Sequence, residues 1–198
     1  MSEPKVQDNR FSSDAAFDSL YSLRAQQLSS IHWTPLQVAK KAAAYLAEGP
    51  GKHILDIGSG VGKFCIIGAY YFPEYIFHGV EQRKTLVDEA IIAQNATGVL
   101  NANFIHANFT ELDMELYDHF YFYNSFSENI NHYKPIDNLI DASYNIFQYY
   151  LSQFSNILAE KPSGTRLATF HCYDDEVPPG YKQVHHITGE QLKLWIKQ

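Results

Sequence analysis

The sequence predicts an α/β fold: a doubly wound, mostly parallel seven-stranded sheet with helices on both faces and a C-terminal antiparallel hairpin. Strand-like apolar runs alternate with helix-like segments five times, which is typical of a parallel sheet with right-handed crossovers. A glycine-rich turn joins the first apolar run to a helix-like segment. The last two strand-like runs, 181–187 and 192–196, have no helix between them and therefore predict an antiparallel pair at one edge.

In the first half of the chain, proline and glycine mark where most elements end. Thr34 has the side chain of a helix N-cap and Pro35 suits the first helical position. The predicted elements of this half are a helix at 11–30, a helix from 35 to about 48, a strand ending at 57, a helix at 64–72 and a strand at 75–81.

The second half continues the alternation and then ends it. The long segment 136–158 has apolar residues at helical spacing, which predicts an amphipathic helix. The predicted elements of this half are a helix at 84–96, strands at 103–107 and 117–123, the helix at 136–158, a strand at 165–173, and the two closing strands.

Composition predicts one cytoplasmic domain. The 198 residues are 45% hydrophobic and 19% charged, as in ordinary globular proteins. We expect a single domain over 1–198, with 1–34 as an N-terminal helical extension over the cleft. No apolar run approaches the roughly 20 residues that cross a bilayer, and the polar first residues lack a signal-peptide core. We therefore expect no membrane association.

Charge and ligand-type residues exclude several function classes. A net charge of −7 argues against affinity for nucleic acids. The nine histidines do not have metal-ligand spacing: His171 adjoins Cys172 and His185 adjoins His186, and adjacent strand residues point to opposite faces, so no metal is expected. Cys65 and Cys172 lie in apolar runs and are expected to be buried thiols. Oligomeric state is left open.

The most informative stretch is the turn after the first strand. Asp56 ends an apolar run and is followed by Gly58, Gly60 and Gly62, so a ligand can lie against bare backbone there. The next apolar run ends in Glu81, and a carboxylate at that strand end can accept two hydrogen bonds from a ribose diol. Together the turn and the carboxylate predict a nucleoside-binding cleft.

The details of the turn favour one kind of nucleoside. Dinucleotide-binding turns usually read G-x-G-x-x-G, whereas here Lys63 stands after three alternating glycines. The carboxylate of Asp56 would repel a phosphate and attract a cationic amino acid. S-adenosylmethionine carries an ammonium, a sulfonium and a ribose, so it suits an acidic residue at each strand end.

At these residues the chain resembles the class I methyltransferase family, whose first motif is hydrophobic-D-x-G-x-G-x-G. The match spans 56–62, and Glu81 fits the acidic residue after the family's second strand. The resemblance implies S-adenosyl-L-methionine as cofactor and in-line methyl transfer to an acceptor. The cofactor-binding residues that it implies are Asp56, Gly58, Ser59, Gly60, Gly62, Glu81, Gln82, Asn108, Phe109, Asn124 and Thr34.

The segment after the fourth strand bears on the acceptor. Residues 123–126 lack the proline of the N/D-P-P-Y/F motif and look more like the Asn-Asn-Phe type of the seven-stranded histone-lysine methyltransferases. That likeness indicates a nitrogen target on a small molecule or a protein side chain, but the basic segments that grip nucleosomes are missing. Candidate catalytic residues are Asn124, Glu128 and His132.

Two other functions remain open at this point. The missing N/D-P-P-Y/F motif is also compatible with a regulatory or partner-binding protein that binds the cofactor without transfer. An NAD-dependent dehydrogenase is the third reading, and Asp56, Lys63 and the closing hairpin all disfavour it.

Overall fold

The chain forms one seven-stranded sheet in the order β3-β2-β1-β4-β5-β7-β6. A computed structural model describes residues 8–124, 126, 136–137, 143–187, 189 and 191–198. Pairs from β3 to β5 are parallel, while β7 runs antiparallel to both β5 and β6, which confirms the predicted sheet and hairpin. The strands are β1 His53–Ile57, β2 Ile76–Glu81, β3 Ala102–His106, β4 His119–Tyr123, β5 Arg166–Phe170, β6 Tyr181–Ile187 and β7 Leu192–Lys197.

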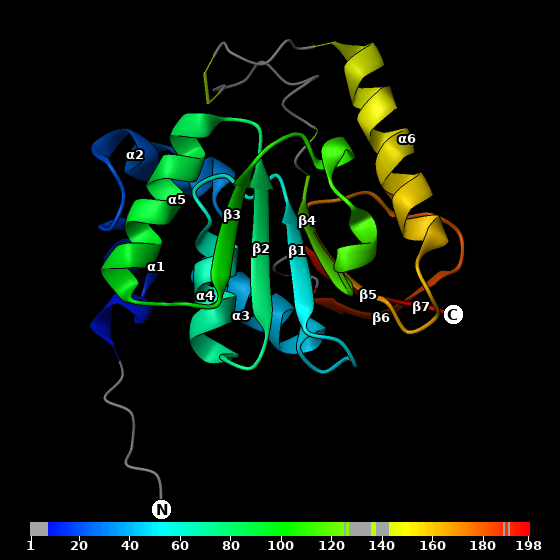
Figure 1. Cartoon of the computed structure of the whole chain (residues 1–198), viewed down its shortest axis with the longest axis horizontal. Coiled ribbons are helices and arrows are strands. Elements are labelled where there is room, and N and C mark those ends of the chain that lie inside the picture. Colours follow the sequence, from blue (N-terminus) through cyan, green and yellow to red (C-terminus); the bar gives the residue numbers. More distant parts are fainter. Residues whose placement is uncertain (1–7, 125, 127–135, 138–142, 188, 190) are drawn as a thin grey trace, which may run out of the picture.

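Helices cover both faces because alternate strand residues are apolar on each side. One core joins residues of β1, β2 and β4 to α3 (Leu36–Leu46), α4 (Lys63–Tyr71) and α5 (Lys84–Thr97). On the other face Phe154 and Leu158 of α6 (Tyr144–Glu160) pack in a second core with the neighbouring strand residues. Figure 1 shows α6 in yellow, well apart from α5 and the blue N-terminal helices.

The N-terminal region differs from the single helix predicted at 11–30. It forms a short 3₁₀ turn, η1 (Asn9–Phe11), then α1 (Asp14–Asp18) and α2 (Leu23–His32). Each α-helix has its own serine N-cap, because Ser13 accepts from the Ala16 N–H and Ser22 from the Ala25 N–H. Two caps within one apolar stripe divide the segment, and the prediction of a continuous helix was wrong.

Two further boundaries were predicted wrongly. Thr34 does not cap α3, because its hydroxyl lies 2.9 Å from the Tyr121 hydroxyl; the Leu36 N–H donates instead to Asp14. The helix expected from 136 begins at Tyr144, and Ile136 precedes it as non-helical chain. In both cases a long-range contact takes a group that local pattern assigned to a helix.

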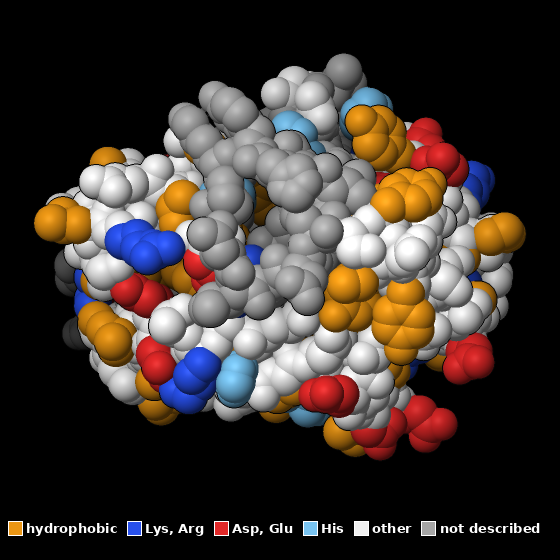
Figure 2. Space-filling model, turned by 90° about the horizontal axis from the view of Figure 1, so that it is seen from above, with side chains coloured by type: hydrophobic (Ala, Val, Ile, Leu, Met, Phe, Trp, Pro, Cys, Tyr) orange, Lys and Arg blue, Asp and Glu red, His pale blue; other side chains and the backbone are white. Residues whose placement is uncertain are grey.

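Strand order reverses between β1 and β4, and ligands of doubly wound sheets bind beyond the strand carboxyl ends at such a point. Figure 2 looks down on this edge and shows hydrophobic side chains gathered on the side of α6, where Tyr144 and Tyr149 are exposed. Within the described ranges, no helix is both long and apolar enough to cross a membrane. Nor do three or more His, Cys, Asp or Glu there form a group suited to a metal ion.

Three short 3₁₀ turns complete the described chain. They lie in the connections around β3, β4 and β5, and their bounds are η2 Phe109–Glu111, η3 Met114–Leu116 and η5 Asp174–Glu176.

Candidate functional site

The glycine turn folds back onto the end of β2. The N–H groups of Gly58 and Ser59 both donate to the Val80 carbonyl, at 2.9 and 3.0 Å. Gly60 and Gly62 have φ of +53° and +73°, in the left-handed region that favours glycine. A Cβ on Gly62 would lie 2.4 Å from the Phe104 ring, so this glycine lets α4 start close against β3.

Glu81 lies at the carboxyl end of β2, where the sequence predicts it. Its side chain is buried, and its two oxygens accept from the Gly60 N–H at 3.1 Å and the Arg83 N–H at 2.9 Å. A carboxylate offers about four lone-pair positions in all. The acid and the turn therefore form one hydrogen-bonded unit.

Arg83 holds that unit in place. Its guanidinium is buried, lies 3.8 Å from a Glu81 oxygen and donates through Nε to both oxygens of Asp137 at 3.1 Å. An arginine between two carboxylates offsets part of the cost of burying all three charges. The chain of charges runs from Asp137 through Arg83 to Glu81.

Asp56 is a buried acid beneath the turn. Its side chain is 3% exposed, and the Cys65 thiol donates to its Oδ2 at 3.8 Å. Burial, chiefly, and the nearby Glu81 carboxylate raise the pKa of Asp56 well above its ordinary value. A cation brought to this place would favour the ionised carboxylate.

Trp33 covers the turn from the side of α2. A Cβ on Gly60 would lie 2.8 Å from the Trp33 ring, so indole and backbone are in direct contact. The indole N–H donates to the Ala25 carbonyl at 2.7 Å, which ties the ring to α2. Thr34 beside it is buried against Tyr121.

Lys63, at the start of α4, joins the turn to α1. Its ammonium is buried and lies 2.6 Å from Asp14 and 2.7 Å from Asp18. In the sequence, Lys63 served only as evidence that the turn does not bind a dinucleotide, and its structural role was not predicted. Two acids four residues apart on a helix were the signal for an anchoring partner, because such residues share one face.

Two small cavities flank Gly58, each of about 20 Å³, which is room for one water. The first lies toward β3 and is lined by residues that include Glu81, Gln82 and Phe109. The second lies toward β4, and its lining includes Asp56 and Trp33. Each cavity is much smaller than a nucleoside, so a ligand spanning both has to displace lining side chains, and Trp33 lines the second cavity.

The predicted adenine-side residues lie together at the ends of β2 and β3. Asn108 caps η2 by accepting from the Thr110 N–H, and its amide donates to the Tyr150 hydroxyl at 2.7 Å and to Gln82 at 3.3 Å. Phe109 is buried in a stack with Phe126, their centroids 5.2 Å apart, and still lines the first cavity.

The predicted acceptor-side residues are only partly described. Asn124 follows β4 with φ of +38°, an uncommon conformation for a residue other than glycine and one that concentrates at functional sites. Tyr123 before it donates to the Ile31 carbonyl at 3.0 Å and lines the second cavity. Glu128 and His132 lie outside the described residues.

Sequence reasoning missed Arg83, Asp137 and Tyr121. Tyr121 was predicted only as part of a strand. Because it lies between Phe120 and Phe122, its side chain points to the face opposite theirs, toward α4. There its ring stacks on Phe64, with the ring centroids 3.9 Å apart. Arg83 gave no signal of its own, because it pairs with Asp137, 54 residues away.

These residues fit a cationic adenosyl amino acid in chemistry. The buried carboxyl of Asp56 suits a positive group, the bonded carboxylate of Glu81 suits a diol, and Gln82 and Asn108 offer amides beside an aromatic wall. The fit in volume depends on movement of lining side chains such as that of Trp33.

No family model matches the chain. Two tRNA (guanine-N(7)-)-methyltransferases from Synechococcus strains are 43% and 41% identical to it over 54 residues. That segment is 27% of this chain and 23% of each relative, so the match spans about a quarter of the relatives' length.

Solved structures match over most of the chain. The match to MtNAS in complex with MTA and tNA covers 95% of this chain and 67% of the MtNAS chain, with a TM-score of 0.59 and 16% sequence identity. The match to an RNA methyltransferase from Salinibacter ruber in complex with S-adenosyl-L-homocysteine covers 83% of this chain and 91% of the methyltransferase chain. Its TM-score is 0.52 and the sequence identity is 17%.

The match to TrmN from Thermus thermophilus covers 85% of this chain and 55% of the TrmN chain, with a TM-score of 0.58 and 19% sequence identity. In this chain the fold is a mostly parallel seven-stranded sheet with a closing antiparallel hairpin. The fold of this chain is that of the class I S-adenosylmethionine-dependent methyltransferases.

Proposed function

We propose that this protein is an S-adenosylmethionine-dependent methyltransferase. The observation that carries the proposal is the hydrogen-bonded unit of glycine turn and Glu81, with the buried carboxyl of Asp56 beneath it. A dinucleotide would place phosphates beside Asp56, where burial already disfavours negative charge.

The proposed roles follow position. The turn and Asp56 hold the methionine end, with Thr34 and Asn124 at its border, and Glu81 takes the ribose hydroxyls. Gln82, Asn108 and Phe109 contact the adenine. The residues of the turn are Gly58, Ser59, Gly60 and Gly62.

The cofactor supplies a methyl group that its sulfonium already activates. What remains for the protein is to align the acceptor and to exclude water, which can supply much of the rate acceleration. In the free protein Trp33 and Tyr121 are buried and line the second cavity. We propose that Asn124 positions the acceptor, and that Glu128 or His132 accepts a proton if the acceptor must lose one.

Cofactor entry in this scheme moves Trp33, and the chain offers an internal control for that movement. The chain has two tryptophans, and Trp195 is buried in the sheet, where its indole donates to Thr169 at 2.9 Å. S-adenosylhomocysteine should change the protein's tryptophan fluorescence in the Trp195→Phe variant but not in Trp33→Phe. The opposite pattern would show that the ligand does not enter past Trp33.

Calorimetric titration distinguishes the cofactor classes. We expect S-adenosylhomocysteine to bind with one site per chain and NAD to show no saturable heat. Tight binding of NAD without binding of S-adenosylhomocysteine would overturn the proposal.

The acceptor is proposed to be a small molecule or a protein side chain with a nitrogen target, in the cytoplasm. The names of the two Synechococcus relatives give tRNA as their substrate, whereas the net charge of −7 here disfavours binding to phosphates. Cell extract incubated with the protein and methyl-labelled cofactor should yield label that survives nuclease treatment. Label lost on nuclease treatment would assign a nucleic-acid acceptor.

The same assay tests the second candidate, a regulatory protein that binds the cofactor without transfer. The missing N/D-P-P-Y/F motif after β4 favours that candidate. It would be supported by binding of S-adenosylhomocysteine together with no labelled product in any fraction.

A further inference from the structure

A third cavity, of about 490 Å³, lies between α2, the first turns of α5 and the short segment 136–137. That volume lies in the range of small-molecule sites. It shares no described lining residue with the two cavities beside Gly58. Its described lining is Ser22, Arg24, Ala25, Leu28, Thr85, Leu86, Glu89, Ile136 and Asp137.

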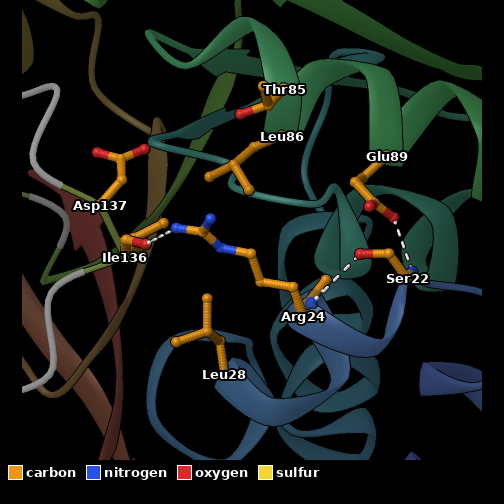
Figure 3. Close-up of a pocket in the computed structure, with 9 residues that line it drawn as sticks. Ser22, Arg24, Leu28, Thr85, Leu86, Glu89, Ile136 and Asp137 are labelled. Atoms are coloured by element: carbon orange, nitrogen blue, oxygen red, sulfur yellow. Dashed lines mark hydrogen bonds between the residues drawn. The ribbon is translucent and has the colours of Figure 1, made fainter.

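Arg24 extends its guanidinium into this cavity. Figure 3 shows the side chain running between Leu28 and Leu86 toward Ile136. Its Nη2 donates to the Ile136 carbonyl at 2.8 Å, and no described carboxylate lies within ion-pair distance of the guanidinium. A guanidinium has five N–H donors in a planar fork that matches a carboxylate, so most of its donors remain for a ligand.

Glu89 faces the same cavity from α5. One of its oxygens accepts from the Ser22 N–H at 3.0 Å, and no described lysine or arginine pairs with it. Figure 3 shows Glu89 beside Ser22, away from the guanidinium end of Arg24. A cation and an anion thus face one cavity without neutralising each other.

Apolar groups supply the rest of the lining. Ala25 and Leu86 are buried, and Leu28 and Ile136 are half-buried, so a ligand with an apolar body removes their remaining surface from water. The remaining acid, Asp137, is already paired with Arg83. A multiply charged phosphate is disfavoured because two carboxylates line the same space.

From these contacts we infer that the cavity binds a zwitterionic, amino-acid-like small molecule. Arg24 holds its carboxylate, Glu89 holds its ammonium group, and the leucine and isoleucine side chains contact its apolar part. The inference stands apart from the proposed methyl transfer, because the site needs no cofactor to form.

The test is calorimetric titration of the full chain without cofactor, with L-leucine and L-phenylalanine as probes. Three analogues of leucine remove one charge each: L-leucinamide and 3-methylbutylamine lack the carboxylate, and 4-methylpentanoate lacks the amine. We expect saturable binding of at least one amino acid, and binding of its analogues weaker by about tenfold or more, as for a lost charged hydrogen bond.

Variants locate the binding within the protein. Arg24→Met and Glu89→Gln should each weaken amino-acid binding by about tenfold. Matched controls lie outside the cavity on α5: Lys84→Met and Asp88→Asn break a solvent-exposed pair and should leave affinity unchanged. Both cavity variants change partly exposed side chains, so they should keep the thermal transition of the parent protein.

The inference is overturned if neither amino acid shows saturable binding. It is also overturned if the analogues that lack one charged group bind as tightly as the amino acid itself. Equal losses in the cavity and control variants overturn it too. Since no cofactor is present, these results are independent of the titration with S-adenosylhomocysteine. Amino-acid binding without cofactor binding would keep this site and remove the proposed function.

Discussion

At the scale of single residues, Asp56 carries the most distinctive electrostatic feature of the site. Burial raises the pKa of its carboxyl, so the folded free protein keeps this proton to a higher pH than an exposed aspartate does. The unfolded chain ionises near the ordinary aspartate value of about 3.9. Stability therefore falls as pH rises from that value toward the pKa of the folded protein, because the folded state binds the proton more tightly.

This leads to a prediction for the cofactor. A cation beside Asp56 favours the ionised form, so binding releases a proton wherever the free carboxyl is neutral. Affinity for S-adenosylmethionine should then rise with pH, by up to about tenfold per pH unit, until the free carboxyl is itself ionised. Calorimetry in buffers of different ionisation enthalpy measures the proton release.

The Asp56→Asn variant is the control, since the amide keeps the shape and cannot ionise. Its affinity should be lower and free of this pH dependence. A pH dependence that persists in Asp56→Asn would assign the proton to another group.

Gly60 makes a second prediction at this scale. Gly60→Ala places a Cβ at φ of +53° and 2.8 Å from the Trp33 ring, whereas Gly98→Ala has a similar φ of +71° and open space. We expect Gly98→Ala to cost about 1 kcal/mol from backbone strain alone. Gly60→Ala should cost a further ~1–3 kcal/mol from overpacking.

Urea denaturation of both variants measures the difference. Equal losses of stability would mean that Trp33 moves aside without cost and does not pack firmly on the turn.

At the scale of secondary-structure elements, one lysine ties α1 to the site. Lys63→Met removes a buried ammonium from Asp14 and Asp18, and leaves the Asp18 side chain, 13% exposed, without its cation. We expect a loss of about 3 kcal/mol in the free energy of unfolding. Lys84→Met, which breaks the exposed pair with Asp88, should cost less than about 1 kcal/mol.

Urea melts of the two lysine variants provide the comparison. If Lys63→Met costs no more than Lys84→Met, α1 is held by its apolar contacts, such as those of Phe17, and not by the ion pairs.

The same elements show how far sequence carries the fold. The seven strands, the closing hairpin and the helices after β1 and β2 were predictable, because alternation, glycine and proline are local signals. The division of the N-terminal helix was not predicted, since its apolar stripe continues across the capping residue Ser22. The start of α6 was misplaced because apolar Ile136 fits the helical spacing but lies outside the helix.

The candidate site divides in the same way. Glu81 and the glycine turn were predictable, because a motif of fixed spacing follows a strand. Arg83 and its partner Asp137 were not, because a pairing across 54 residues leaves no periodic trace in sequence. Thr34 was expected as a helix cap, and only the fold brings it to Tyr121, 87 residues later.

At the scale of the whole molecule, the linings of two cavities meet at one buried chain of charges. Glu81 lines the cavity beside Gly58, Asp137 lines the larger cavity at α2, and Arg83 contacts both acids. The buried charges thus connect the linings of the two cavities.

The central claim, that Glu81 holds the ribose of an adenosyl cofactor, is tested most directly by the affinity of S-adenosylhomocysteine for Glu81→Ala. Loss of hydrogen bonds to a charged group costs ~1–3 kcal/mol, so affinity should fall by about 5- to 150-fold. Glu81→Gln is the milder variant, because its one amide oxygen still accepts from one of the Gly60 and Arg83 N–H groups, and it should also bind more weakly.

Glu74→Ala is the matched control, because this exposed acid precedes the opposite end of the same strand and should leave binding unchanged. Weakened binding in both Glu81 variants and not in Glu74→Ala is the predicted result. Unchanged affinity in folded Glu81→Ala would contradict the assignment of the ribose to this carboxylate.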